Sequence, residues 1–497
     1  MDNVGVAELQ HCVDAVLSFL EPYWSFVNCH MVNYLIDDHW AHMVPHPLRA
    51  ELQAVDHVHQ AIKTFFSQTA RDSPQFPALA QFLETCERHC LAGFPQLLTS
   101  VEQLEQLLPV TMGTHLSIKE FMSAKKCHEV EQTAALINKL VQSTTSESSA
   151  ECYIVDAGDG KGYLSSRLAL QYGHRVLGID AKKSNTENAL ARNSKLKRAW
   201  NGLTERAELQ SQGITPPRRG KKLATKATPV NIPVQDNYKT TSRFITTELN
   251  LCDLLKEHFV QELKVVKPRI CLTGLHTCGN LAATCLQVFH AQDICRVLCS
   301  VGCCYHLLRE RYSQQEFYGN KALMEESTDY GFPLSRHLQQ RGVCLGRNAR
   351  MLAAQSIERT LSAKELPNIT IFYRALLEIL VCRRAPHLKN QLKVGKVHKF
   401  NNFIEYVQIC AKKLGEPWLA AVGEAELVAL LQQHDTDRHY LSLFYLLRMS
   451  FAPVLESVIL LDRLLYLKEL GYEHSYLIDL FDAVISPRHY AIVALKP

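Results

Sequence analysis

The stretch IVDAGDGKGYLSSRLAL, residues 154–170, decides the fold of this 497-residue chain. A short apolar run ends at Asp156, glycines follow at alternate positions (Gly158, Gly160 and Gly162), and an apolar pattern of helical spacing then begins. Because glycine has no Cβ, such a loop can turn tightly and let its backbone approach a ligand. The helix that follows directs free N–H groups toward the same place. The stretch therefore predicts a strand, a ligand-binding loop and a helix.

Two kinds of cofactor site use this arrangement, and the glycine spacing separates them. Dinucleotide sites prefer G-x-G-x-x-G, whose third glycine eases packing beside a pyrophosphate. In this chain the spacing is G-x-G-x-G, and Tyr163 takes the place of that third glycine. Asp156 suits a ligand with a positively charged amino group, and S-adenosyl-L-methionine has an amino-acid end and no phosphate. The loop therefore favours S-adenosyl-L-methionine over a nicotinamide cofactor.

The next two strands supply further candidate cofactor contacts. The stretch HRVLGID, residues 174–180, ends at Asp180, and a carboxylate at this strand end can accept hydrogen bonds from both ribose hydroxyls. We expect the third strand at residues 243–249. Glu248 and Asp253 flank the end of that strand and are the candidates for meeting the adenine amino group.

The order of the elements along the chain predicts the fold class. Further strands are expected at residues 269–276, 296–303 and 488–496. Strands separated by helices of about 10–15 residues indicate a parallel, doubly wound sheet. We expect an α/β fold with a Rossmann-like sheet of the class I methyltransferase type. The expected parts are an N-terminal helical region (1–115), the core (116–310) with a basic loop (211–242), a helical insertion (311–450), and a C-terminal helix and strands that complete the sheet (451–497).

Histidine and cysteine gather after the fourth and fifth strands, in GLHTCGNL (274–281) and SVGCCYHL (300–307). These strands are neighbours in a doubly wound sheet, so both clusters should face one cleft. Methyl transfer depends mainly on aligning the nucleophile, the methyl group and the leaving sulfur, so groups that position the acceptor matter most. The residues that we expect to handle the acceptor are His276, Cys278, Asn280, Tyr305 and His306.

Two other interpretations of these clusters stay open. Thiolate and imidazole suit zinc, so His276, Cys278, Cys303, Cys304 and His306 could bind a metal. The histidines and cysteines could also simply pack in the fold. Because the spacing within each cluster is unlike that of a zinc finger, we assign no metal ligand from the sequence.

Composition limits the classes of function. With 47% hydrophobic and 21% charged residues, the chain fits a globular protein of two or three domains. The net charge of +4 does not by itself indicate a nucleic-acid-binding protein, so any basic surface must be local. A local one exists at residues 218–226, which hold five Lys and Arg residues. It is either a solvated linker or a contact for RNA, an RNA-binding protein or the nuclear-import machinery.

The chain shows neither a secretory signal nor a membrane span. Its most apolar stretch, residues 454–467, is interrupted by Glu456, Asp462 and Arg463, which favours an amphipathic helix. The seventeen cysteines are expected to be reduced thiols. We therefore expect a cytoplasmic protein, with the nucleus as the alternative, and no membrane partner.

These residues resemble the methyltransferase-like protein 25 family. The shared stretches are AKKCHEV (124–130), VDAGDGKGYLS (155–165), LTGLHTCGNL (272–281), SVGCCYHLL (300–308), ESVILLDRLLYLKELG (456–471) and SPRHYAIVALK (486–496). The resemblance implies a methyltransferase that uses S-adenosyl-L-methionine, with the donor loop on Asp156 and the three glycines and the ribose contact on Asp180. The chain departs from the family at Asp159, where serine is usual, at Asp180, where glutamate is frequent, and at Asn280, where aspartate is frequent.

A shorter resemblance links the histidine and cysteine clusters to transfer-RNA ribose 2′-O-methyltransferases, which implies RNA as the acceptor. The function that we expect is S-adenosyl-L-methionine-dependent methylation of RNA or of an RNA-associated protein. The alternative is a non-catalytic binding or scaffold protein that retains the methyltransferase fold.

Overall fold

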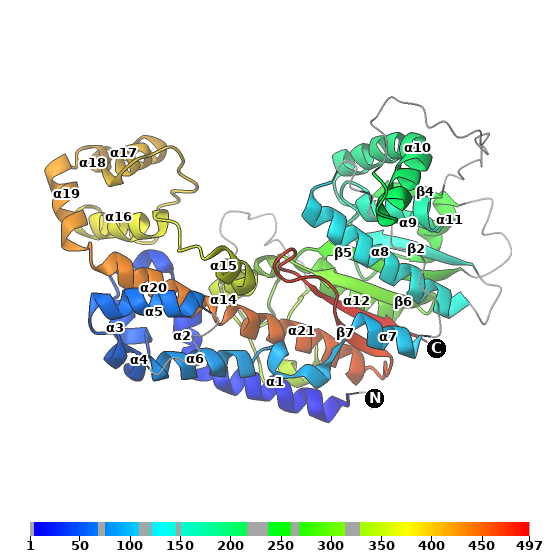
Figure 1. The fold of residues 1–497 in the computed structure, drawn as a ribbon, viewed down its shortest axis with the longest axis horizontal. Coiled ribbons are helices and arrows are strands. Elements are labelled where there is room, and N and C mark those ends of the chain that lie inside the picture. The colour runs from blue at the N-terminus through cyan, green and yellow to red at the C-terminus, as the bar shows by residue number, and fades with distance from the viewer. Residues whose placement is uncertain are drawn as a thin grey trace. The chain divides into compact units, whose positions relative to one another are not determined.

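The computed structural model describes residues 4–67, 75–108, 118, 122–145, 151–215, 237–259, 268–313 and 329–496. The chain divides into two compact units, each built from segments far apart in the sequence (Figure 1). The sheet unit comprises Met1–Val13, Phe94–Leu345 and Val458–Pro497. The helical unit comprises Asp14–Gly93 and Gly346–Ser457.

The sheet unit is built on an eight-stranded sheet of order β1-β7-β8-β6-β5-β2-β3-β4. Its strands are β1 (Leu98–Thr99), β2 (Cys152–Ala157), β3 (Arg175–Asp180), β4 (Tyr238–Ser242), β5 (Arg269–Thr277), β6 (Cys295–Gly302), β7 (Ser475–Asp479) and β8 (Tyr490–Leu495). Neighbouring strands are parallel except that β8 runs antiparallel to β6 and β7. This mixed α/β sheet confirms the predicted Rossmann-like fold of the class I methyltransferase type.

The strand order reverses at β2, which has β3 on one side and β5 on the other. Every residue of β2 is buried, as is usual for a parallel strand covered on both faces. In open α/β sheets, ligands bind outside the carboxyl ends of the strands at such a switch point. The glycine loop follows β2, and the first histidine and cysteine cluster follows β5, so the topology brings the two predicted motifs to one place.

Helices cover both faces of this sheet. The helices α8 (Ala124–Thr145) and α9 (Tyr163–Gln171) share a core with alternate strand residues, among them Val301 of β6. The next residue, Gly302, faces the opposite way. A Cβ there would collide with the Arg463 guanidinium of α21 (Ala452–Glu469), and α12 (Leu281–Ala291) lies beside it. Gly302 therefore allows α21 to pack closely on the second face.

The charges within α21 do not face solvent, so the expected amphipathic helix is wrong. Glu456, Asp462 and Arg463 are all buried. Asp462 accepts hydrogen bonds from the backbone N–H groups of Leu334 and Ser335, at 2.8 and 2.9 Å, and from the Ser335 hydroxyl. A buried carboxylate is tolerated when it is paired in this way, although burial still raises the pKa of Asp462 to about 6.

One described stretch, Asp437–Glu469, is long and apolar enough to cross a membrane by length and composition alone. In the fold, 83% of its most apolar window is buried.

The third strand lies at residues 238–242 and not at 243–249, which corrects the sequence analysis. YKTTS is polar and shows little apolar alternation, yet it pairs with β3 from Val176↔Tyr238 to Asp180↔Ser242. Phe244, which made the later stretch look strand-like, is 78% exposed. The two-residue strand β1 also lies within the region that was expected to be helical, because so short a strand carries no readable periodicity.

The helical unit joins the N-terminal helices to most of the expected insertion. Its helices, with α1 (Val6–Leu20) at the boundary, are α2 (Trp24–Asn28), α3 (His39–Met43), α4 (His46–Glu51), α5 (Val55–Phe66), α6 (Pro77–Arg88), α14 (Arg347–Ala353), α15 (Ile357–Ala363), α16 (Thr370–Arg384), α17 (Phe403–Leu414), α18 (Pro417–Ala420), α19 (Glu424–Gln433) and α20 (Asp437–Met449). Phe444 of α20 meets Phe26 and Tyr34 at ring distances of 4.7 and 5.2 Å. Aromatic packing of this kind ties the two sequence segments into one body.

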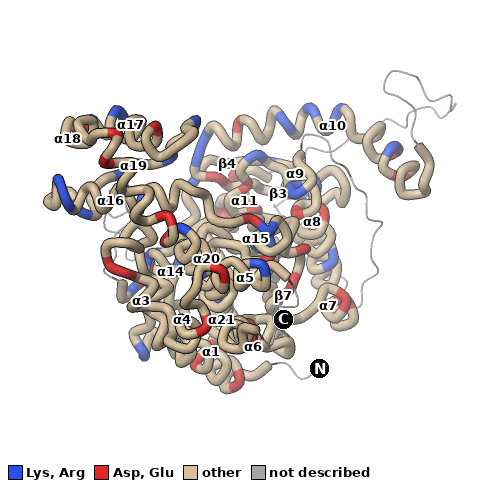
Figure 2. Tube along the Cα trace, turned by 60° about the vertical axis from the view of Figure 1, so that its left-hand side comes forward, with Lys and Arg blue, Asp and Glu red and all other residues tan. Residues whose placement is uncertain are grey.

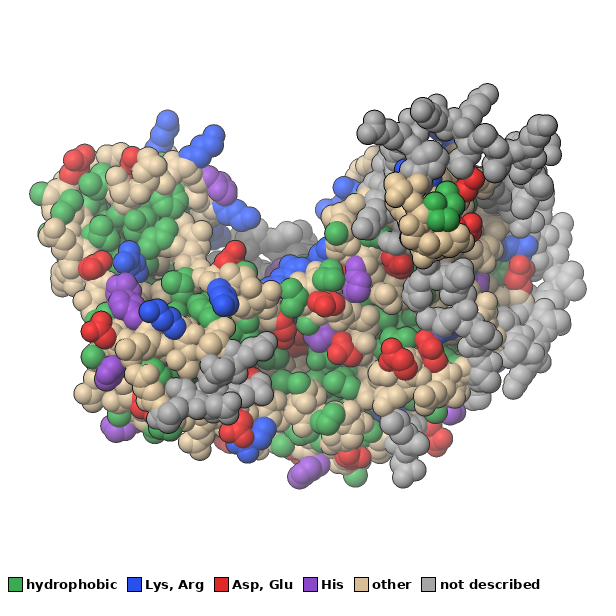
Figure 3. Space-filling model, viewed as in Figure 1, with side chains coloured by type: hydrophobic (Ala, Val, Ile, Leu, Met, Phe, Trp, Pro, Cys, Tyr) green, Lys and Arg blue, Asp and Glu red, His purple; other side chains and the backbone are tan. Residues whose placement is uncertain are grey.

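The remaining helices of the sheet unit are α7 (Val101–Leu107), α10 (Lys183–Ser211), α11 (Leu251–His258) and α13 (Arg336–Gln340). Lys and Arg recur along α10 in Figure 2, where they outnumber Asp and Glu. The basic residues of α10 are Lys183, Arg192, Lys195, Lys197, Arg198 and Arg206. On the face of the molecule shown in Figure 3, charges of both signs are interspersed. The basic loop at 218–226 lies outside the described residues.

Candidate active site

The glycine loop between β2 and α9 has the backbone that its sequence predicts. Gly158, Gly160 and Gly162 have φ values of +77°, +59° and +68°, in the left-handed region that glycine tolerates best. The backbone N–H of Gly158 donates to the carbonyl oxygen of Ile179 on β3 at 2.8 Å. A Cβ on Gly160 would meet only the Gly158 carbonyl, at 3.7 Å, and otherwise open space. The tip of the loop is therefore where a ligand can approach the backbone.

Asp180, at the end of β3, lies beside this loop. Its carboxylate accepts hydrogen bonds from the backbone N–H groups of Gly160 and Lys182, at 3.0 and 2.8 Å, and from the Asn185 amide at 3.0 Å. A carboxylate offers about four acceptor positions, so about one remains for a ligand hydroxyl. Asp180 holds the loop and also occupies the strand end where we expected the ribose contact.

Asp156 and Asp159 lie beneath the loop, which changes the role expected for Asp156. Asp156 is only 2% exposed and accepts a hydrogen bond from the Ser165 hydroxyl of α9 at 2.8 Å. Asp159 is 8% exposed and accepts one from the Tyr238 hydroxyl of β4. The two carboxyl groups fasten the loop to its neighbours, and so small an exposure leaves Asp156 little access to a donor amino group. Burial raises the pKa of Asp159 to about 6, and burial and the nearby Asp159 raise the pKa of Asp156.

The raised pKa of Asp159 predicts a pH-dependent stability change. The stability that a carboxyl group of raised pKa contributes is complete below about pH 4 and is lost as the pH rises through about 6. Asp159→Asn removes the ionisation but keeps an oxygen for the Tyr238 hydroxyl. We expect its free energy of unfolding to exceed that of the wild type by about 2 kcal/mol at pH 8 and to match it at pH 4. Urea unfolding at both pH values measures this, with the exposed Asp253→Asn as control. A gain that is independent of pH would contradict the prediction.

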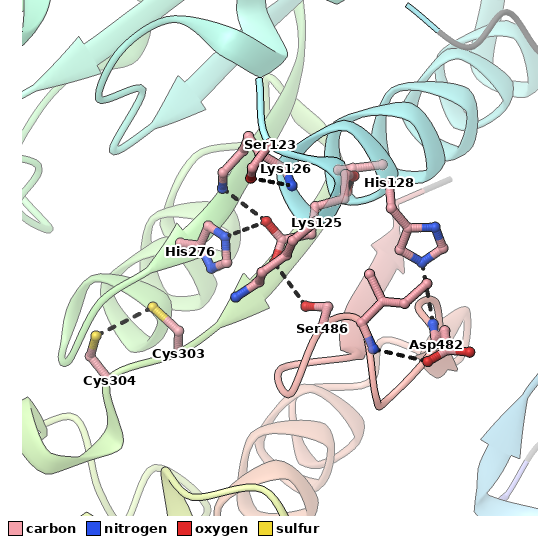
Figure 4. A network of polar contacts seen from close by, with 12 residues as sticks. Ser123, Lys125, Lys126, His128, His276, Cys303, Cys304, Asp482 and Ser486 are labelled. Carbon is pink, nitrogen blue, oxygen red and sulfur yellow. Dashed lines mark hydrogen bonds and ion pairs between the residues drawn. The ribbon is translucent and has the colours of Figure 1, made fainter. Parts of the chain in front are cut away.

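A pair of side chains at the end of β5 adds a residue that sequence analysis missed. The Nε2 atom of His276 lies 3.0 Å from the Oε2 atom of Glu129 on α8 (Figure 4). Glu129 is fully buried. It also accepts a hydrogen bond from the Ser486 hydroxyl at 2.8 Å and forms an ion pair with Lys126 at 2.9 Å. Burial alone would raise the pKa of Glu129, but His276 and Lys126 outweigh it and hold that pKa far below its usual range. These contacts favour the charged form of Glu129 beside His276.

The Glu129 carboxylate orients the His276 ring. A carboxylate on one imidazole nitrogen fixes the tautomer and the direction of the ring, as in catalytic histidine–carboxylate pairs. The side chain of His276 is 26% exposed, so part of the ring is open to solvent. Its φ of +70° is uncommon for a residue with a side chain, and such strain concentrates at functional sites. The stretches AKKCHEV and SPRHY, which carry Glu129 and Ser486, were part of the family resemblance but gave no hint of this pairing.

The two cysteine-bearing loops also meet, as expected from neighbouring strands. The Cys278 sulfur lies 3.2 Å from that of Cys303 and 3.3 Å from that of Cys304, and the last two are 3.6 Å apart. Cys304 accepts hydrogen bonds from both other thiols, and these bonds lower its pKa. His306, whose charge also lowers the pKa of Cys304, is half-buried nearby.

Asn280 and Tyr305 make contacts within the fold. The Asn280 amide donates to the carbonyl oxygen of Asp329 and accepts from the backbone N–H of Arg309, both at 2.8 Å. Both ends of its side chain are thus occupied in holding the segments that follow β6. Tyr305 is 1% exposed, and the guanidinium groups of Arg463 and Arg488 lie 5.7 and 5.6 Å from the centre of its ring. These contacts give both residues a structural role.

Glu248 and Asp253 were chosen from a third strand at 243–249, and that premise is wrong. Both side chains are exposed. Glu248 accepts a hydrogen bond from the Thr247 hydroxyl, and Asp253, in the first turn of α11, pairs with Lys256 at 3.2 Å. The residue at the end of β4 is Ser242, which pairs with Asp180. The reason for assigning Glu248 and Asp253 to the adenine ring therefore no longer holds.

Comparison with known proteins agrees with the fold. Residues 125–311 match a family described as a methyltransferase domain. The match runs from α8 past β6 and includes the glycine loop, His276 and the three clustered cysteines. The chain is 29% identical to the protein named probable methyltransferase-like protein 25 of Homo sapiens, over 97% of this chain and 96% of that protein. It is 28% identical to the Mus musculus protein of the same name, over the same shares. These findings confirm the predicted family resemblance, and residues 125–311 are similar to a methyltransferase domain.

Proposed function

We propose that this protein transfers a methyl group from S-adenosyl-L-methionine to RNA or to an RNA-associated protein. The observation that carries the proposal is the glycine loop at the switch point of the sheet, with its open tip at Gly160 and with Asp180 beside it. These residues fit the donor because a backbone free of side chains can lie against it and Asp180 retains capacity for a ribose hydroxyl.

The acceptor side of the proposal rests on His276 and Glu129. When bound, the donor would supply a methyl group on a sulfonium sulfur, and that sulfur would leave as a neutral thioether as the methyl carbon bonds to a nucleophilic atom of the acceptor. If that atom carries a proton, His276 can take it, and the Glu129 carboxylate stabilises the imidazolium that forms. Because β5 lies next to β2 in the sheet, this pair and the donor loop stand at adjacent strand ends.

The choice of RNA rests on charge. The α10 helix, which leads into the basic loop at 218–226, carries six basic and three acidic residues. Basic residues arranged along one helix attract phosphate groups, and such binding weakens as salt increases. The seventeen free thiols fit a reducing compartment, so we place this activity in the cytoplasm or the nucleus.

A second candidate function is a non-catalytic binding protein that retains the fold. It is favoured by Asn280 and Tyr305, whose side chains serve structural contacts where a methyltransferase could place acceptor contacts. One experiment separates the two candidates. Tritiated S-adenosyl-L-methionine is incubated with the protein and with fractionated cellular RNA and protein.

We expect label in RNA or in RNA-bound protein, and loss of at least about 90% of that label with His276→Ala, since general acid–base groups contribute about 100-fold or more. Donor binding measured by calorimetry with no label in any fraction would favour the non-catalytic alternative. Absence of donor binding by the wild type would exclude the proposed activity.

A further inference from the structure

We propose that Cys278, Cys303 and Cys304 bind one zinc ion at the carboxyl ends of β5 and β6, with a fourth coordination position left for solvent. This site is independent of the donor loop and goes beyond the proposed methyl transfer. Among the residues that the structure describes, no other group of three or more His, Cys, Asp and Glu side chains brings its ligand atoms as close together.

The spacing of the sulfur atoms fits tetrahedral coordination. Zinc–sulfur bonds of about 2.3 Å at tetrahedral angles place two thiolates about 3.8 Å apart. The three pairs in the cluster are 3.2, 3.3 and 3.6 Å apart. Outward movements of a few tenths of an ångström, within the reach of side-chain torsions, therefore suffice to admit the ion. Three thiolates are also a donor set that zinc prefers over magnesium or calcium.

The backbone brings these thiols together at a cost that packing alone does not explain. Cys304 has a φ of +23°, outside the regions that residues with side chains usually occupy. Most of the other cysteines are buried in the hydrophobic core, where a thiol behaves as a small hydrophobic group. Cys278, in contrast, is exposed at the edge of the cluster. Strain at Cys304 that turns its sulfur toward the other two is expected of a ligand site.

The two loops are held in place before any ion binds. Thr277 of β5 donates a hydrogen bond to the carbonyl oxygen of Val301 on β6 at 3.0 Å. A Cβ on Gly279 would lie 2.8 Å from the carbonyl oxygen of Leu307, so only glycine lets the loops approach this closely. Asn280 clamps the backbone of Arg309. The three thiols are thus preorganised. They should bind a metal more tightly than the same thiols on two mobile loops would.

The burial of the three thiols indicates an open coordination position. Cys303 is buried, Cys304 is half-buried and Cys278 is exposed, so solvent reaches one side of the cluster. Zinc sites with three protein ligands keep such a position for water or substrate, whereas closed structural sites have four.

Metal content tests the proposal without any methyl transfer. Untagged full-length protein is purified under reducing conditions without chelator, and zinc per chain is measured by mass spectrometry of the elements. We expect about one zinc ion per chain in the wild type. Cys278→Ser and Cys304→Ser are expected to lower it at least about 10-fold. The matched control is Cys344→Ser, because Cys344 is also exposed but lies outside the cluster. Circular dichroism verifies that each variant is folded.

Cobalt substitution tests the ligand set directly. Cobalt(II) bound to three thiolates gives intense sulfur-to-metal absorption and tetrahedral d–d bands, which we expect to weaken in Cys303→Ser and to persist in Cys344→Ser. Wild-type protein that binds neither ion would overturn the proposal. So would equal zinc content in all cluster variants, or peptide mapping that finds a Cys278–Cys303 disulfide in place of metal. Because donor binding is measured separately by calorimetry, failure of either idea is distinguishable from failure of the other.

Discussion

Gly160→Arg is expected to abolish binding of S-adenosyl-L-methionine, with an affinity at least about 100-fold below that of the wild type, or about 2.7 kcal/mol. The physical reason is that a Cβ on Gly160 points into open space at the tip of the donor loop. A side chain as large as arginine there would fill the volume in which the donor meets the backbone. Calorimetry with the purified variant measures the loss, and it requires no knowledge of the acceptor.

The matched control is Gly173→Arg. Gly173 has a φ of +73°, and no heavy atom lies within 4 Å of a Cβ placed there. Its position between α9 and β3 is at the opposite end of the strands from the donor loop. Both substitutions carry the left-handed backbone penalty of about 1–2 kcal/mol, so both variants should lose similar thermal stability. If the two variants bound the donor equally well, the loop would not be the donor site.

The donor loop could be predicted because its information is local. The strand, the three glycines and the first turn of α9 are consecutive, and each follows from the residue types at those positions. Strands β2, β3, β5, β6 and β8 were recognised for the same reason, since each is a buried apolar run. The adjacency of β5 and β6 then followed from the topology of doubly wound sheets.

What could not be predicted depends on contacts between distant residues. Glu129 and His276 are 147 positions apart, and their pairing exists only because α8 packs on β5. Asp159 accepts a hydrogen bond from Tyr238 of β4, a polar strand that pairs through its backbone and shows no apolar pattern. Asp462 reads as a solvent-facing charge until the backbone of residues 334–335 is placed against it. In each case a polar group is satisfied by a partner that no local pattern identifies.

Glu129→Gln is expected to reduce the rate of methyl transfer about 100-fold while leaving donor affinity unchanged. Glutamine keeps the shape of the side chain and a hydrogen bond to His276, but it removes the negative charge that would stabilise a protonated imidazole. The charges that lose their partner, Lys125 and Lys126, are 41% and 26% exposed, so water solvates them and the fold should tolerate the change. The expected effect is therefore on turnover and not on stability. It is measured as initial rates of label incorporation at saturating donor, with donor affinity taken from calorimetry.

The control is Glu105 of α7, which pairs with the opposite end of α8 from Glu129. Glu105 forms an ion pair with Lys139 of α8 and touches neither His276 nor the donor loop. If α8 acted only as a packing element, Glu105→Gln and Glu129→Gln would lower activity by similar factors. The pairing seen here predicts instead that Glu105→Gln retains nearly full activity. Glu129→Asp, which keeps the charge on a shorter side chain, should recover part of the rate that Glu129→Gln loses. If Glu129→Asp recovered no rate, the negative charge by itself would not be what His276 depends on. The loss of rate would then come from the position of the carboxylate, which Ser486 and Lys126 also contact.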